Sequence, residues 1–247
     1  MDKIGYSVND NIFDEVYNTL TNYGMPCDNF LKNIRTLKIT SSSSNKTGYN
    51  PNRNTIFLSD NDNLVHELFN VASYDRKNIS GNIGMSFYDK NKILRGENFS
   101  NGVIDLFTSL IEPSYKSSCE FEMCCAKILT YLFGMDIFKS HFNNNASEFF
   151  LQFRFCTNRV RQIIYSIDKH KKYQETALKF SKLGKSFDYT NMKNNFHDIF
   201  LSFEKLAHIL KLDLEEYKKF VNNLLHSSDY MTLLCESLEY NIEEKQL

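Results

Sequence analysis

The sequence predicts an α+β fold in which a small mixed sheet near the N-terminus is followed by a mostly helical C-terminal half. Two short runs, residues 35–40 and 55–58, carry strand-forming side chains between polar turn residues. Beyond Pro113 nearly every segment repeats apolar residues at the spacing of an α-helix. Helix should therefore far exceed strand in the folded chain.

The composition is that of an ordinary globular protein. The chain has 247 residues, of which 42% are hydrophobic and 24% charged. A formal net charge of −1 argues against a nucleic-acid partner. The sequence shows no apolar run long enough to cross a membrane and no secretion signal, so we expect no membrane partner and a cytoplasmic location. The six cysteines lack CxxC spacing, which argues against a zinc ribbon and a thioredoxin motif.

The first part of the chain alternates helical and extended segments. An amphipathic pattern begins near Asn9, where Asn9 or Asp10 can cap the helix, and ends at Gly24. A stretch rich in serine, asparagine and glycine separates the two strand-like runs and predicts a loop. The predicted elements are a helix at 9–23, a helical turn at 30–34, a strand at 35–40, a loop at 41–54 and a strand at 55–58.

Two further helices follow the second strand. Residues 63–74 place Leu64, Leu68 and Val71 on one face, and Asp60 or Asn61 can cap the helix. Residues 83–88 could form a short strand. The next helix is expected at 100–111, with Ser100 as its cap and a proline beyond its end.

The remaining chain is predicted to be helical, with a charged break at 169–172. We expect three parts: an N-terminal α/β subdomain at 1–95, a helical subdomain at 96–170 and a C-terminal helical extension at 171–247. The helices are expected at 120–133, 136–142, 146–153, 158–168, 173–187, 194–210, 214–226 and 229–240.

The helix at 63–74 carries the sequence His66-Glu67-x-x-Asn70. His66 and Asn70 are four residues apart, so their side chains lie on one face of the helix. The pattern His-Glu-x-x-His would place two imidazoles there to hold Zn²⁺, with the glutamate as general base toward a metal-bound water. Because Asn70 replaces the second histidine, the motif lacks one ligand.

The helix at 100–111 carries a second pattern, Asn101-Gly-x-x-Asp105. Together the two helices resemble zincin-like metallopeptidases of the gluzincin type, whose second helix carries Asn-Glu-x-x-x-Asp/Glu. The resemblance covers roughly Leu37 to Asp168 and implies a zincin-like fold. It implies that Asn101 stands at the position of the third zinc ligand and that Asp105 orients a histidine from outside the metal shell. It also makes Glu67 a vestigial general base and Tyr115 a possible residue of the cleft.

The ligand positions predict that zinc is absent. A catalytic zinc needs three histidine, carboxylate or thiolate ligands. At the vestigial positions only His66 qualifies, because Asn70 and Asn101 offer neutral amides. We therefore expect no metal and no other cofactor. Substitute ligands remain open, and the candidates are Glu97, Asp105, Glu112, Cys119 and His141.

Three functions are compatible with these patterns. The favoured one is a catalytically inactive zincin-like protein, a pseudopeptidase, that binds a peptide or protein partner at a cleft beside the strand at 55–58. The alternatives are an active zinc metallopeptidase with a rearranged ligand set and a structural or interaction protein with a filled cleft. In each case His66 and Asp105 should lie within hydrogen-bonding reach, if only as a buried contact between two helices.

Overall fold

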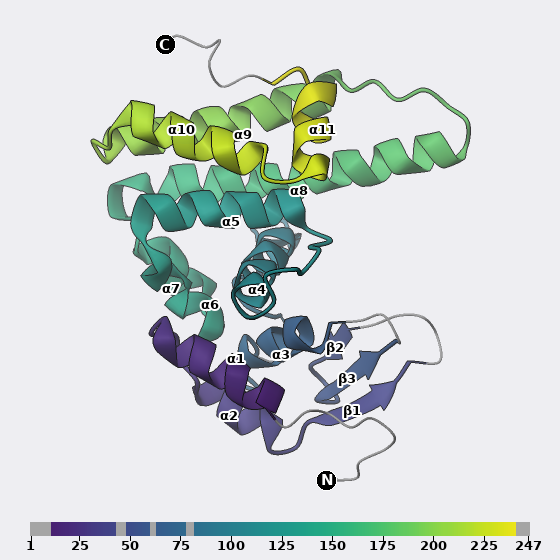
Figure 1. The fold of residues 1–247 in the computed structure, drawn as a ribbon, viewed down its shortest axis with the longest axis vertical. Helices are drawn as coiled ribbons and strands as arrows, with labels where there is room; N and C mark the ends of the chain where they lie inside the picture. Colours follow the sequence, from purple (N-terminus) through teal and green to yellow (C-terminus); the bar gives the residue numbers. More distant parts are fainter. Residues whose placement is uncertain (1–10, 43–47, 60–62, 78–81, 241–247) are drawn as a thin grey trace.

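A computed structural model of the protein describes residues 11–42, 48–59, 63–77 and 82–240. The N-terminal helices and the sheet lie at one end of the long axis, and the C-terminal helices lie at the other end (Figure 1). Helix α4 (Glu97–Ile111) stands between the two ends. One continuous cluster of buried hydrophobic residues extends from Val16 to Leu238. The predicted predominance of helix and the small mixed sheet are confirmed.

The sheet contains β1 (Lys38–Ser41), β2 (Gly48–Asn50) and β3 (Thr55–Leu58) in the spatial order β1-β3-β2. β1 runs parallel to β3, and β2 runs antiparallel to it. The prediction of a loop throughout 41–54 is therefore wrong at β2. The chain folds back here because Tyr49 is partly buried and its hydroxyl donates to Asn54 Oδ1 at 2.8 Å.

The position of β3 also corrects the predicted peptide-binding edge. β3 is the central strand, so β1 and β2 occupy both of its sides. A peptide cannot add to β3 without displacing one of them. In the part of the chain that the structure describes, β2 pairs only with β3, and it also contacts α3 (Leu64–Ala72).

A two-stranded hairpin replaces the single strand predicted at 83–88. β4 (Phe87–Tyr88) pairs with β5 (Leu94–Arg95) in an antiparallel arrangement separate from the main sheet. The turn is organised by Asp89, whose Oδ1 accepts from the backbone N–H groups of Asn91 at 2.8 Å and Ile93 at 3.0 Å.

The first helices are α1 (Asn11–Asn22), α2 (Asp28–Ile34) and α3. The cap of α3 is Asn63, whose side chain accepts from the backbone N–H of His66 at 3.0 Å. The predicted cap is Asp60 or Asn61, and both lie outside the described residues. Asparagine is a favourable cap because its side-chain oxygen replaces a missing carbonyl at the helix start.

Helix α4 begins at Glu97, three residues before the predicted cap Ser100. Asp168 from α8 (Thr157–Lys182) stabilises this start, since its carboxylate accepts from Gly96 N at 2.9 Å and Asn98 Nδ2 at 3.1 Å. The hydroxyl of Ser100 instead accepts from Met85 N at 3.1 Å. The cap prediction failed because the capping carboxylate is distant in sequence.

Helices α4 and α5 (Glu120–Phe133) approach closely at Gly102. A Cβ atom at Gly102 would lie 2.4 Å from the carbonyl carbon of Glu122, so only glycine fits. The sequence predicts the bounds of α5 correctly. This helix has buried residues on most of its sides, so its apolar run covers the whole helix.

The predicted break at 169–172 is wrong, because α8 continues through it. This stretch holds no proline or glycine, His170 is buried, and Lys171 Nζ lies 3.6 Å from Glu122 Oε1.

Among the described helices, none has both the length and the apolar character needed to span a membrane. The remaining elements are the 3₁₀ segments Met135–Phe138 and Arg154–Cys156 and the helices α6 (Lys139–Phe142), α7 (Ala146–Leu151), α9 (Thr190–Ile209), α10 (Leu214–Leu225) and α11 (Asp229–Ser237).

Candidate functional site

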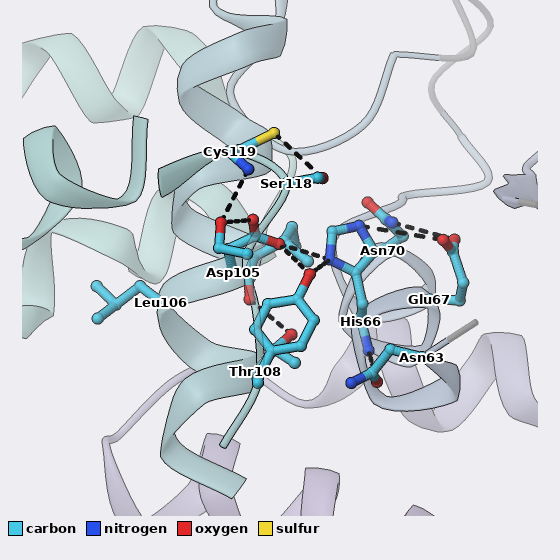
Figure 2. A network of polar contacts seen from close by, with 12 residues as sticks. Asn63, His66, Glu67, Asn70, Asp105, Leu106, Thr108, Ser118 and Cys119 are labelled. Carbon is cyan, nitrogen blue, oxygen red and sulfur yellow. Dashed lines mark hydrogen bonds and ion pairs between the residues drawn. The ribbon is translucent and has the colours of Figure 1, made fainter. Parts of the chain in front are cut away.

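The contact between α3 and α4 brings His66 and Asp105 together. His66 Nδ1 lies 2.7 Å from Asp105 Oδ1, within the predicted hydrogen-bonding reach (Figure 2). Asn63 links the same helices a second time, because its Nδ2 donates to the carboxylate of Glu112 at the end of α4. These contacts fix the position of His66 at the first turn of α3.

Asp105 is completely buried and is held by donors from three places in the chain. Its Oδ1 interacts with His66 and accepts from the Tyr115 hydroxyl at 2.9 Å, and its Oδ2 accepts from the Ser117 hydroxyl. Ser117 Oγ in turn accepts from Cys119 N at 2.9 Å. The sequence interpretation missed Ser117, and its only signal was a polar residue in the short connection between α4 and α5.

Tyr115 lies where the sequence placed a possible cleft residue. Its hydroxyl is 3.3 Å from His66 Nδ1, and the two ring centroids are 6.4 Å apart. Burial raises the pKa of the Tyr115 phenol, and the charge of Asp105 raises this pKa further. Tyr115 therefore remains protonated and donates to Asp105.

The His66–Asp105 pair favours its ionised form. Burial by itself lowers the pKa of His66, but the hydrogen bond to Asp105 and the charges of Glu67 and Asp105 raise this pKa above its ordinary value. Burial acts in the opposite direction on Asp105, yet its bonds to His66, Ser117 and Tyr115 hold the pKa below the ordinary value. An imidazolium–carboxylate pair therefore persists up to at least the ordinary pKa of histidine.

Glu67 and Asn70 interact with each other on the same helix. Asn70 Nδ2 donates to Glu67 Oε2 at 3.2 Å, and Glu67 Oε1 lies 4.0 Å from His66 Nε2 (Figure 2). Glu67 is 6% exposed and Asn70 is 9% exposed. The side chain of Asn70 is therefore engaged with the carboxylate of Glu67 on this face of the helix.

Asn101 is half-buried on α4, one turn before Asp105. Within the described ranges, no hydrogen bond of its side chain joins it to His66, Glu67 or Asn70. The structure therefore brings His66, Glu67, Asn70, Asp105 and Tyr115 into one polar network, and among the described residues no hydrogen bond joins the Asn101 side chain to it.

Of the five candidate substitute ligands, Asp105 contacts His66, through Nδ1 of the imidazole, and no contact with His66 is found for the other four among the described residues. Glu97 is exposed on the first turn of α4, and Glu112 accepts from Asn63. Burial raises the pKa of the Cys119 thiol to about 11, which opposes a metal-binding thiolate. His141 is fully buried beside Gly84, and its ring nitrogens have no hydrogen-bonding partner among the described residues.

The donor set does not fit a catalytic zinc ion. His66 offers one strong ligand, its Nε2, because the bond from Nδ1 to Asp105 leaves that nitrogen available; the amide of Asn70 donates toward Glu67 and does not supply a second strong ligand. A search of the described residues finds no cluster of three or more histidine, cysteine, aspartate or glutamate side chains suited to a metal.

Comparisons with protein-family models, with curated proteins and with solved structures find no match. The site is therefore defined by its own geometry as a buried histidine–carboxylate network between two packed helices, beside the outer strand of a small sheet.

Proposed function

We propose that the protein is a catalytically inactive, zincin-like pseudopeptidase that binds an extended peptide or protein segment. The observation that carries this proposal is the bond from Asn70 to Glu67. At the position where a metallopeptidase of this type needs a second imidazole, an amide stands instead, and it donates to the carboxylate of the would-be general base. The remaining histidine is engaged by Asp105.

The outer edge of β2 is the site that we propose for the bound segment. β2 lies beside α3, and its described pairing is confined to β3. An extended segment can add to such an edge through backbone hydrogen bonds, which give affinity with little demand on sequence. This placement replaces the edge of β3, which is occupied on both sides.

A selection from a library of random linear peptides tests the binding. Selected peptides should bind the full chain. Along β2, successive N–H groups point toward β3 and away from it, and an added peptide would use those that point away. Proline has no N–H, so proline at such a position among Gly48, Tyr49 and Asn50 should abolish binding. The matched control is Ser41→Pro on β1. Lys38 N donates to Asn54 O at 3.0 Å and Ser42 N donates to Leu58 O at 2.7 Å, so by alternation the N–H of Ser41 points away from β3 on the opposite edge.

The result separates the proposal from its alternatives. Peptides that bind wild type and Ser41→Pro equally, and β2 proline variants poorly, support the proposal. Peptides insensitive to every β2 variant, or no selected peptide at all, contradict it and favour an interaction protein with a filled cleft. Chelator-sensitive cleavage of unfolded casein that is abolished in Glu67→Gln would establish the active-metallopeptidase alternative.

A further inference from the structure

A polar cavity of about 530 Å³ opens at the end of the three-stranded sheet. The turn 51–54 between β2 and β3 forms one side of it. Thr36 lies before β1, while Tyr74 and Arg76 follow α3, and these residues form the other sides. The cavity is separate from the His66–Asp105 network and shares no residue with it.

The charge of this cavity is entirely positive. Arg53 and Arg76 line it, and no aspartate or glutamate of the described chain does. Within the same described part, neither arginine has a carboxylate oxygen within 4.0 Å. Asp75, the sequence neighbour of Arg76, instead accepts from the backbone N–H of Lys77 at 3.0 Å. Two exposed guanidinium groups therefore share a concave surface without an acidic partner.

The guanidinium group of Arg76 is oriented in advance by neutral acceptors. Its Nε donates to Asn33 Oδ1 at 2.8 Å, and its Nη2 donates to the Thr36 hydroxyl. Asn33 is buried and is fixed in turn, since its Nδ2 donates to Val71 O at 2.9 Å and Tyr74 O at 2.7 Å. Nη1 has no acceptor among the residues that the structure describes.

We propose that this cavity binds an oxyanion, a phosphate or a carboxylate group, between Arg53 and Arg76. A guanidinium group presents planar, paired N–H donors that match the oxygens of both groups. Binding should cost little side-chain conformational entropy at Arg76, because its hydrogen bonds to neutral acceptors already hold the guanidinium group in place. The proposal stands without the peptide-binding function, since it depends on a different set of side chains.

Titration of the full ¹⁵N-labelled chain tests the site, with inorganic phosphate and acetate as separate probes at constant ionic strength. Phosphate or acetate should cause saturable shifts of the Arg53 and Arg76 Nε–Hε signals and of the backbone amides of 52–54. Arg53→Gln should weaken binding about tenfold, because a charge-assisted bond is lost. Arg76→Lys should weaken it less than Arg76→Gln, because it keeps the charge but loses the paired donors.

The matched control is Arg35→Gln, because Arg35 is exposed next to Thr36 but does not line the cavity. It should leave the affinity unchanged. The stronger probe identifies the oxyanion as phosphate or carboxylate. Shifts that do not saturate, or an equal loss in Arg35→Gln and Arg53→Gln, would overturn the proposal. Arg53→Gln keeps the test decisive if the Arg76 variants fold poorly, since Arg53 lies on an exposed turn.

Discussion

Replacing Asp105 with asparagine should reveal how strongly the His66–Asp105 pair stabilises the fold. The asparagine side chain would keep the shape of the aspartate and one of its two acceptor oxygens, so either Tyr115 or Ser117 would lose its acceptor, and it would remove the charge that faces His66. Asp105 is fully buried, and the side chain of His66 is 18% exposed. The imidazole would therefore lose its ionic partner in a poorly solvated position.

The expected loss is large for a single substitution. Removing one member of a buried ion pair typically costs about 3–5 kcal/mol. The partial exposure of His66 places this pair near the lower end, at about 3 kcal/mol in free energy of unfolding. For a chain of this size, that loss corresponds to a fall in Tm of about 6–12 °C.

The loss should depend on pH with a definite sign. The folded-state pKa of His66 is raised, so its contribution is complete below the ordinary histidine pKa and disappears as pH rises through the folded value. The folded-state pKa of Asp105 is lowered, so its contribution is present above the ordinary aspartate pKa and disappears as pH falls through the folded value. The difference between wild type and Asp105→Asn should therefore be largest at about pH 5.5 and smaller at about pH 9.

Urea unfolding across this pH range, with the His66 proton signal followed by NMR, measures both effects. Asp136→Asn is the control, since Asp136 forms an exposed ion pair with Lys139 at 2.9 Å and such pairs contribute little. Buried histidines elsewhere change the free energy of unfolding of wild type and Asp105→Asn equally, so their effect cancels when one free energy is subtracted from the other. A His66 pKa at or below its ordinary value in wild type, or a difference that does not change with pH, would refute the reasoning.

Three further variants, one of them double, test the ligand positions, the helix packing and a buried histidine. The double change Asn70→His and Asn101→Glu should create a zinc site, detected by calorimetry and by a Tm that zinc raises. Wild type and each single variant should bind zinc weakly. No zinc binding by the double variant would show that Asn101 is not at a ligand position. Gly102→Ala should lower the free energy of unfolding by about 2 kcal/mol or more, because its Cβ would lie 2.4 Å from the carbonyl carbon of Glu122; an unchanged urea midpoint would contradict this. Burial lowers the pKa of His141 to about 3, so wild type should lose stability as pH falls below the ordinary histidine pKa, and His141→Leu should lose less; equal slopes in the two proteins would count against it.

The sequence predicts the helices of the site because their signals are local. Apolar spacing identifies α5 with its correct bounds and α3 with errors of one and two residues at its ends, and the resemblance to gluzincins implies that the helices of His66 and Asp105 contact each other. The contact between them is confirmed, while their role stays a prediction.

The missed features depend on contacts that are distant in sequence. β2 has only three residues, and its pairing with β3 creates the strand. The start of α4 depends on a carboxylate from α8, and the Asp105 network depends on a hydroxyl from the connection before α5. Local propensity holds no information about partners that only tertiary folding supplies.

The direction of β2 gives a last prediction that joins the two proposals. β2 runs from Gly48 to Asn50, and the turn that lines the arginine cavity follows it directly. A peptide parallel to β2 would direct its C-terminal carboxylate toward Arg53 and Arg76, whereas an antiparallel peptide would direct its cationic N-terminus toward them. If both proposals hold, amidation of the C-terminus of a selected peptide should weaken binding about tenfold, and acetylation of its N-terminus should not. Tighter binding after acetylation, with no effect of amidation, would mean that the peptide runs antiparallel to β2, because acetylation removes a positive charge that the two arginines repel, and that the cavity serves a different oxyanion.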